Sequence, residues 1–258
     1  MIRRRFSIPA RVLAGLVLAV LSPAAAMAAA EEVEARRYAN CMAQAVKSPD
    51  AAFETAMGWS YEGGGYPARH CAASALLALE HYAEAATRLE QMAEDMIGAE
   101  ARLRPSVLNQ AGRAWMLHGD LGRSLANYTI ALQLAPGEPD LLVGRSTVLA
   151  LGGRYWEALD DLNTALEATP DDVEALVMRA SAYRLVENAE LAMADVERAL
   201  ALQPDHTGAL LERGNLRRLI GDDDGARADW VKLLQTDPKS VPADAARANL
   251  EKLDVKIE

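Results

Sequence analysis

The sequence predicts an all-α fold, a solenoid of stacked helical hairpins. Four prolines recur every 34 residues, and each closes a segment whose small and apolar residues fall at the same offsets. Such a period indicates a repeated helical unit. In addition, 51% of the residues are hydrophobic but only 5% are aromatic, which suits close packing of helices on small side chains. Because stacked units present an extended surface, the architecture favours a binding protein. The prolines are Pro136, Pro170, Pro204 and Pro238.

Residues 1–30 have the features of a secretory signal peptide. A basic head at residues 3–5 precedes an apolar run at residues 12–21, and residues 26–28 form a small-x-small cleavage pattern. Ten apolar residues are too few to cross a bilayer, which weighs against the alternative of an uncleaved anchor. General secretion and the twin-arginine route, whose signal the basic head faintly resembles, both stay open. We expect a periplasmic or secreted bacterial protein, with no membrane span in the mature chain.

Charge narrows the choice of partner. The whole chain has a net charge of −10. Residues 1–30 hold four Arg and no acid, so the remainder carries 23 basic and 37 acidic residues, a net charge of −14. Such a surface repels nucleic acid and anionic lipid, so we expect neither as a partner.

Residues 31–104 predict two less regular hairpins, with helices near residues 32–46 and 51–59 and a second unit at residues 66–99. Cys41 and Cys71 are an even number of cysteines in a chain expected to be exported, and they predict one disulfide between the first helix and the next unit. The alternatives are two buried thiols, or a metal site made by His70, Cys71 and His81. That spacing matches none of the usual zinc patterns.

Residues 105–240 contain four regular units. In the unit that ends at Pro170, Ser146 and Leu149 mark one amphipathic helix, Gly152 ends it, and Ala158 marks a second helix. Two helices cannot bury both of their apolar faces within one hairpin. We therefore expect each hairpin to stack on the next.

These units resemble tetratricopeptide repeats. That family places a small residue at position 8, a large apolar or aromatic one at positions 11 and 24, Ala at positions 20 and 27, and Pro at position 32. The resemblance implies a right-handed α-solenoid over residues 105–240 and, more weakly, over residues 31–104. Residues 241–258 then form a capping helix and tail. The matching residues before each proline are Gly112, Trp115, Ser124, Tyr128 and Ala131; Ser146, Leu149, Ala158, Leu162 and Ala165; Ala180, Tyr183, Ala192, Val196 and Ala199; and Gly214, Arg217, Ala226, Trp230 and Leu233, of which Arg217 and Leu233 depart from the pattern.

Three of the four units pair an Arg at position 7 with an Asp at position 23. The unit from residue 105 changes both together, to Ala111 and Asn127. The joint change predicts that each Arg crosses its hairpin and bonds to that Asp as a partly buried structural pair. The alternative is a ladder of ligand-binding arginines. The pairs are Arg145 with Asp161, Arg179 with Asp195, and Arg213 with Asp229.

The resemblance also implies a concave groove, lined from the first helix of each unit. Amides there would hydrogen-bond a peptide backbone and arginines would hold its carboxylates. The alternative is a mixed, solvated face without a dedicated ligand. The carboxylate-clamp variant of the family is rejected, because Gly144 and Met178 stand where Asn or Arg would be needed. The groove residues are Asn109, Arg113, Met116, Thr147, Ser181, Arg184, Asn215 and Arg218, amid apolar residues that include Leu117, Leu151, Leu185 and Leu219.

No motif in the sequence predicts catalysis. The run Asp222-Asp223-Asp224 lacks the distal Glu of a calcium loop and favours helix capping. The four His residues are scattered, so we expect no enzyme activity, cofactor or metal. The function expected is a non-catalytic periplasmic scaffold that binds a protein or peptide in its groove and assembles or regulates an envelope complex. The alternative is an accessory subunit of an envelope enzyme, presenting a small ligand or glycan. The oligomeric state is not predicted.

Overall fold

A computed structural model describes residues 23–254, so most of the predicted leader lies outside the described residues. Within that range the elements are thirteen α-helices and one 3-10 helix, which confirms the all-α prediction. The helices are α1 Pro23–Lys47, α2 Pro49–Tyr61, α3 Gly65–Ala78, α4 Tyr82–Asp95, η1 Gly98–Leu103, α5 Arg104–His118, α6 Leu121–Leu134, α7 Pro139–Leu151, α8 Tyr155–Ala168, α9 Val173–Leu185, α10 Ala189–Leu202, α11 Thr207–Leu219, α12 Asp223–Thr236 and α13 Val241–Asp254.

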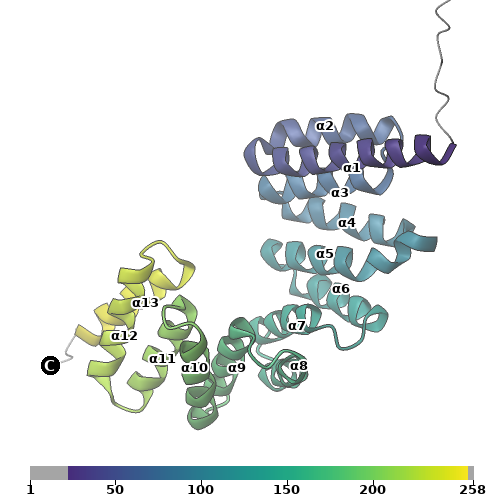
Figure 1. Ribbon diagram of the computed structural model, residues 1–258. Helices are drawn as coiled ribbons and strands as arrows, with labels where there is room; N and C mark the ends of the chain where they lie inside the picture. Colours follow the sequence, from purple (N-terminus) through teal and green to yellow (C-terminus); the bar gives the residue numbers. More distant parts are fainter. Residues whose placement is uncertain (1–22, 255–258) are drawn as a thin grey trace, which may run out of the picture.

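The helices follow one another along a curved path (Figure 1). Each helix packs on its neighbours in sequence, and the first helices of successive hairpins also meet, α5 with α7, α7 with α9 and α9 with α11. The four regular units are α5–α6, α7–α8, α9–α10 and α11–α12. The capping helix is α13, which packs on α11 and α12.

Small residues allow neighbouring helices to approach closely, both between and within hairpins. Between hairpins, a Cβ atom on Gly144 of α7 would lie 2.3 Å from the Tyr128 ring of α6. Within the hairpin of α5 and α6, a Cβ atom on Gly112, at position 8, would lie 2.8 Å from the same ring. In the last unit, a Cβ atom on Gly214 would lie 2.3 Å from the Trp230 indole. Burial between the helices raises the pKa of Tyr128 to about 12. The small residue at position 8 is therefore a packing requirement.

The N-terminal hairpins are held by a disulfide. Cys41 on α1 and Cys71 on α3 are bonded, with their Cα atoms 6.1 Å apart, so neither the free-thiol nor the metal-site alternative holds. The helix α1 is longer than expected and includes the predicted cleavage pattern. Residues 27–36 of α1, around and after this pattern, are exposed.

The three predicted Arg–Asp pairs are present, each joining the two helices of one hairpin. Their shortest N–O distances are 2.7 Å for Arg145 and Asp161, 2.7 Å for Arg179 and Asp195, and 2.6 Å for Arg213 and Asp229. The three Asp residues are at most 7% exposed. Arg217, which departs from the repeat pattern, adds a second bond of 2.7 Å to Asp229. The last unit thus replaces an apolar contact with a second charged one.

Candidate functional site

Four leucines of the first helices remain exposed at the same repeat position. They stand 34 residues apart, and each lies within the last two residues of α5, α7, α9 or α11. Isolated exposed leucines need no explanation, but a regular series on adjacent helices is typical of an interaction surface. We call this series the leucine row: Leu117, Leu151, Leu185 and Leu219, which are 52%, 61%, 42% and 65% exposed.

Two hollows lie along the row. The first has a volume of about 500 Å³ and includes Leu77, Arg113 and Leu117 in its lining. The second, of about 250 Å³, lies between α7 and α9 and is lined by the predicted residues Thr147 and Ser181. Leu151 and Leu185 line this second hollow too, so three of the four leucines of the row border a hollow.

Two predicted groove residues are engaged within the chain. Arg184 donates to Glu212, which is only 5% exposed. The charge of this guanidinium is therefore balanced within the chain, and the group is not available to a partner carboxylate. The side-chain oxygen of Asn215 accepts a hydrogen bond of 2.8 Å from Asn249 on α13. The side-chain oxygen of Asn215, which was expected to bind a peptide backbone, is therefore already hydrogen-bonded to the capping helix.

The remaining predicted groove residues differ in accessibility. Met116 packs against the core, and Asn109 is half-buried without lining either hollow. Arg113 and Arg218 are exposed, and neither forms an ion pair with a described residue. These two arginines are thus the predicted groove cations that stay free to meet a partner.

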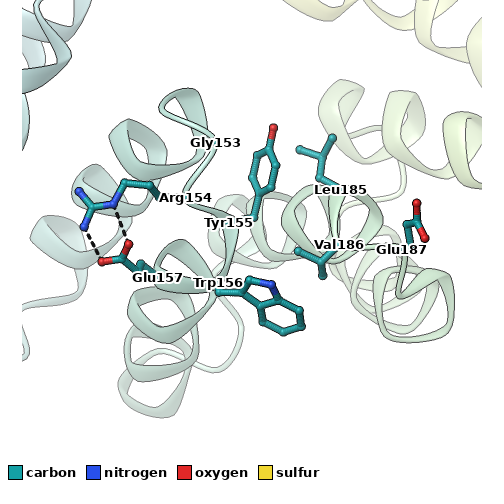
Figure 2. Close-up of a pocket in the computed structure, with 8 residues that line it drawn as sticks. All are labelled: Gly153, Arg154, Tyr155, Trp156, Glu157, Leu185, Val186 and Glu187. Carbon is teal, nitrogen blue, oxygen red and sulfur yellow. Dashed lines mark hydrogen bonds and ion pairs between the residues drawn. The ribbon is translucent and has the colours of Figure 1, made fainter.

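A third hollow, of about 450 Å³, lies where α8 begins and α9 ends (Figure 2). We call it the Trp156 hollow, because Trp156 is its largest side chain and is 69% exposed. Leu185 belongs both to this hollow and to the one between α7 and α9, so the surface continues around the hairpin turn. Sequence reasoning missed Trp156. The available signal was that the corresponding residues, Gly122, Glu190 and Asp224, are small or acidic.

A separate cleft of about 390 Å³ lies among the N-terminal hairpins. This N-terminal cleft is mostly apolar and includes Tyr66, Tyr38, His70 and Gln110. The His70 ring is 2.8 Å from the Tyr38 hydroxyl and 2.9 Å from the Gln110 side-chain oxygen. Burial lowers the pKa of His70. The neutral ring thus joins α1, α3 and α5 across the cleft.

Two further properties concern the described part of the chain alone. None of its helices combines the length and the apolar character that a membrane span requires. Between residues 23 and 254, no three His, Cys, Asp or Glu side chains gather in a way that could hold a metal ion.

Comparison with known proteins identifies the fold. No protein-family model and no curated protein matches the chain. A tetratricopeptide repeat protein from Parabacteroides merdae is similar over 78% of this chain and 73% of its own, with 22% identity and a TM-score of 0.58. A thermophilic repeat protein of Thermus thermophilus is similar over 70% of this chain and 94% of its own, with 22% identity and a TM-score of 0.56. YrrB, described as having an unusual peptide-binding site, is similar over 71% of this chain and 92% of its own, with 17% identity and a TM-score of 0.52. The chain therefore has a tetratricopeptide-repeat fold.

Proposed function

We propose that the chain is a non-catalytic scaffold that binds a segment of a protein or peptide along the face that carries the leucine row, which we call the inner face. The observation that carries this proposal is the leucine row, with its adjoining hollows. Full burial of an exposed leucine contributes about 1.5 to 3 kcal/mol, so each half-exposed leucine offers about 1 kcal/mol. Four such contacts roughly equal the lower estimates of the entropy lost on association. Affinity therefore also needs polar contacts.

Arg113 and Arg218 supply such contacts near the two ends of the leucine row. An Arg side chain can hold a carboxylate through two parallel hydrogen bonds. The ligand is thus a segment with apolar side chains for the row and a carboxylate for at least one of these arginines. The peptide-binding site ascribed to YrrB supports this use of the fold.

The proposed place of action is the bacterial periplasm, where the scaffold assembles or regulates an envelope complex. The leader-like residues 1–30 and the disulfide of Cys41 with Cys71 support this location, because disulfides persist in oxidising compartments. Intact mass of the protein from a periplasmic fraction should match a chain that begins between residues 29 and 31. A full-length chain confined to the cytoplasmic fraction would contradict the location.

Capture experiments test the binding face. The substituted variant carries Leu151→Gln and Leu185→Gln, which remove the middle of the leucine row. The control carries Leu134→Gln and Leu202→Gln, since these leucines end α6 and α10 and are 45% and 43% exposed. From an envelope extract, wild type and control should recover the same proteins and the row variant should lose them. Equal recovery by all three proteins would rule out this face.

A second candidate function rests on the N-terminal cleft. Its volume of about 390 Å³ and its mostly apolar lining fit a small ligand, which would make the chain a ligand-presenting accessory subunit. Native mass spectrometry of protein purified from its own cells tests this alternative. A retained small molecule that is lost when Val107→Trp fills the cleft would favour it over the scaffold.

A further inference from the structure

The three buried tryptophans donate their indole N–H groups within the fold, and two of them also lie beside an arginine. Arg37 lies 4.9 Å from the centre of the Trp59 ring, and Arg123 lies 3.6 Å from that of Trp115. Each of these two indole N–H groups also donates to a glutamate, at 3.1 and 2.8 Å. Trp230 is fully buried, and its indole donates to a backbone carbonyl at 3.3 Å.

Trp156 differs from these three in its exposure and in the lack of a partner for its indole N–H. It is 69% exposed, whereas the others are at most 4% exposed. Within residues 23–254, no cation lies over its ring and no acceptor receives its indole N–H. Figure 2 shows the indole along the hollow, beside Val186 and apart from the ion pair on the other side. An aromatic face and a donor are therefore both presented to solvent.

The two rims of the Trp156 hollow differ in charge. On one rim, Arg154 donates to both carboxylate oxygens of Glu157, one at 2.7 Å. This bonding raises the pKa of Arg154 and lowers that of Glu157, so the pair is ionised and neutral overall. On the other rim, Glu187 is exposed and forms no ion pair with a described residue. The hollow thus carries one uncompensated negative charge.

The backbone fixes where Glu187 stands. Its φ of 62° places it in the left-handed region, which few residues other than glycine adopt. Its N–H donates to the carbonyl of Arg184 at 3.1 Å. The carboxylate is therefore carried by a defined turn at the edge of the hollow, on the other side of Val186 from the indole (Figure 2).

We propose that the Trp156 hollow binds an arginine side chain of the polypeptide partner. The guanidinium stacks on Trp156 and bonds to Glu187, while its aliphatic stem lies on Leu185 and Val186. Charge complementarity supports a cation, because the rim is negative and the whole chain has a net charge of −10. The inference rests on the proposed function in one respect, that the ligand is a polypeptide, and it names one side chain that this ligand presents.

Arginine fits this site better than lysine. Each cation found over an aromatic ring within the described residues is an arginine, as at Trp59, Trp115 and Tyr183. The planar guanidinium stacks on an indole and still bonds a carboxylate at its edge, whereas an ammonium is a strongly hydrated point charge. The partner thus supplies for Trp156 the contact that the chain itself supplies for Trp59 and Trp115.

Fluorescence gives a direct test, because Trp156 is the one highly exposed tryptophan among the four in the sequence. Acrylamide quenching of the native protein therefore reports mainly on Trp156, and Trp156→Phe should remove the quenchable signal. The probe is acetyl-Gly-Arg-Gly-amide. Its two controls, at matched ionic strength, carry citrulline, the neutral isostere, or lysine in place of the arginine. The arginine peptide should protect Trp156, with an affinity about tenfold higher than that of the citrulline peptide.

Two further variants complete the design, one at Glu187 and one at the two ends of the leucine row. Glu187→Gln should weaken the arginine peptide about fivefold and leave the citrulline peptide unchanged. A variant with Leu117→Gln and Leu219→Gln keeps the hollow and should respond as wild type does. Equal protection by the arginine, citrulline and lysine peptides, or none by the arginine peptide, would overturn the assignment.

The two proposals can fail separately. If the row variant loses its captured proteins while the arginine peptide leaves Trp156 unprotected, the scaffold stands and the arginine site falls. If the peptide protects Trp156 while row and control variants capture alike, the arginine site stands and the inner-face proposal falls.

Discussion

The pair of Arg179 and Asp195 offers a quantitative test of how each hairpin is held together. Arg179 on α9 donates two hydrogen bonds of 2.7 Å to the carboxylate on α10, and the side chains are 20% and 10% exposed. Bonding to Asp195 raises the pKa of Arg179, so the guanidinium is charged at any pH at which the fold persists. Asp195→Ala would leave this desolvated charge with Asn163, at 3.0 Å, as its remaining partner among these bonds.

The expected magnitudes follow from that geometry. Breaking a buried pair by removing one partner costs about 3 to 5 kcal/mol, and the partial exposure of Arg179 places Asp195→Ala near about 3 kcal/mol. Arg179→Met should cost a similar amount, because it leaves the carboxylate unpaired. The double variant should cost about 4 kcal/mol in total rather than about 6, a coupling of about 2 kcal/mol.

Urea unfolding followed by circular dichroism measures this cycle, with wild type, both single variants and the double variant in parallel. Arg213→Met is a matched comparison, because Asp229 keeps its bond of 2.7 Å to Arg217. That variant should cost only about 1 kcal/mol, since the carboxylate stays paired. Costs for Arg179 and Asp195 that add within about 0.5 kcal/mol would refute the structural-pair interpretation.

Three further predictions concern stability. Replacing Cys41 and Cys71 by Ser should lower the free energy of unfolding by about 3 to 4 kcal/mol, because the bond closes a loop of 30 residues; an unchanged urea midpoint would contradict this. Burial lowers the pKa of His70 below 6.5, so the folded chain favours the neutral ring. The contribution of this ring to the free energy of unfolding is therefore fully present above pH 6.5 and is lost as the pH falls through the folded pKa. Unfolding curves at several pH values should show this acid loss, and His70→Gln should reduce it. Gly144→Ala should cost about 1 to 3 kcal/mol, because its Cβ would lie 2.3 Å from a buried ring. Gly58→Ala, in a helix with no atom within 4 Å, should instead stabilise by up to about 1 kcal/mol, and equal melting temperatures for the two would disprove the packing argument.

The features that the sequence could predict are those repeated in register. The period of the prolines located the hairpins, and the joint change of Ala111 and Asn127 pointed to the three Arg–Asp pairs. The two cysteines predicted the disulfide, because a chain with two of them has a single possible bond within the chain.

The features that the sequence did not predict depend on side-chain contacts between neighbouring units. Whether Arg184 is free depends on Glu212 in the following unit, and whether Asn215 is free depends on where α13 lies. Position within a repeat assigns both residues to the groove without revealing these contacts. Trp156 escaped for a related reason, because a lone aromatic residue outside the repeat pattern does not show whether it is buried or exposed.

Site-specific photo-crosslinking in the cells that produce the protein tests the binding face most directly. A benzophenone amino acid at Leu151 or Leu185, in the leucine row, is compared with the same group at Leu134 or Leu202 on the second helices. The proposed face predicts a discrete covalent adduct with another polypeptide from the two row positions and none from the other two. Adducts of equal yield at all four positions, or from the second helices alone, would contradict the claim that the row is where the chain binds its partner.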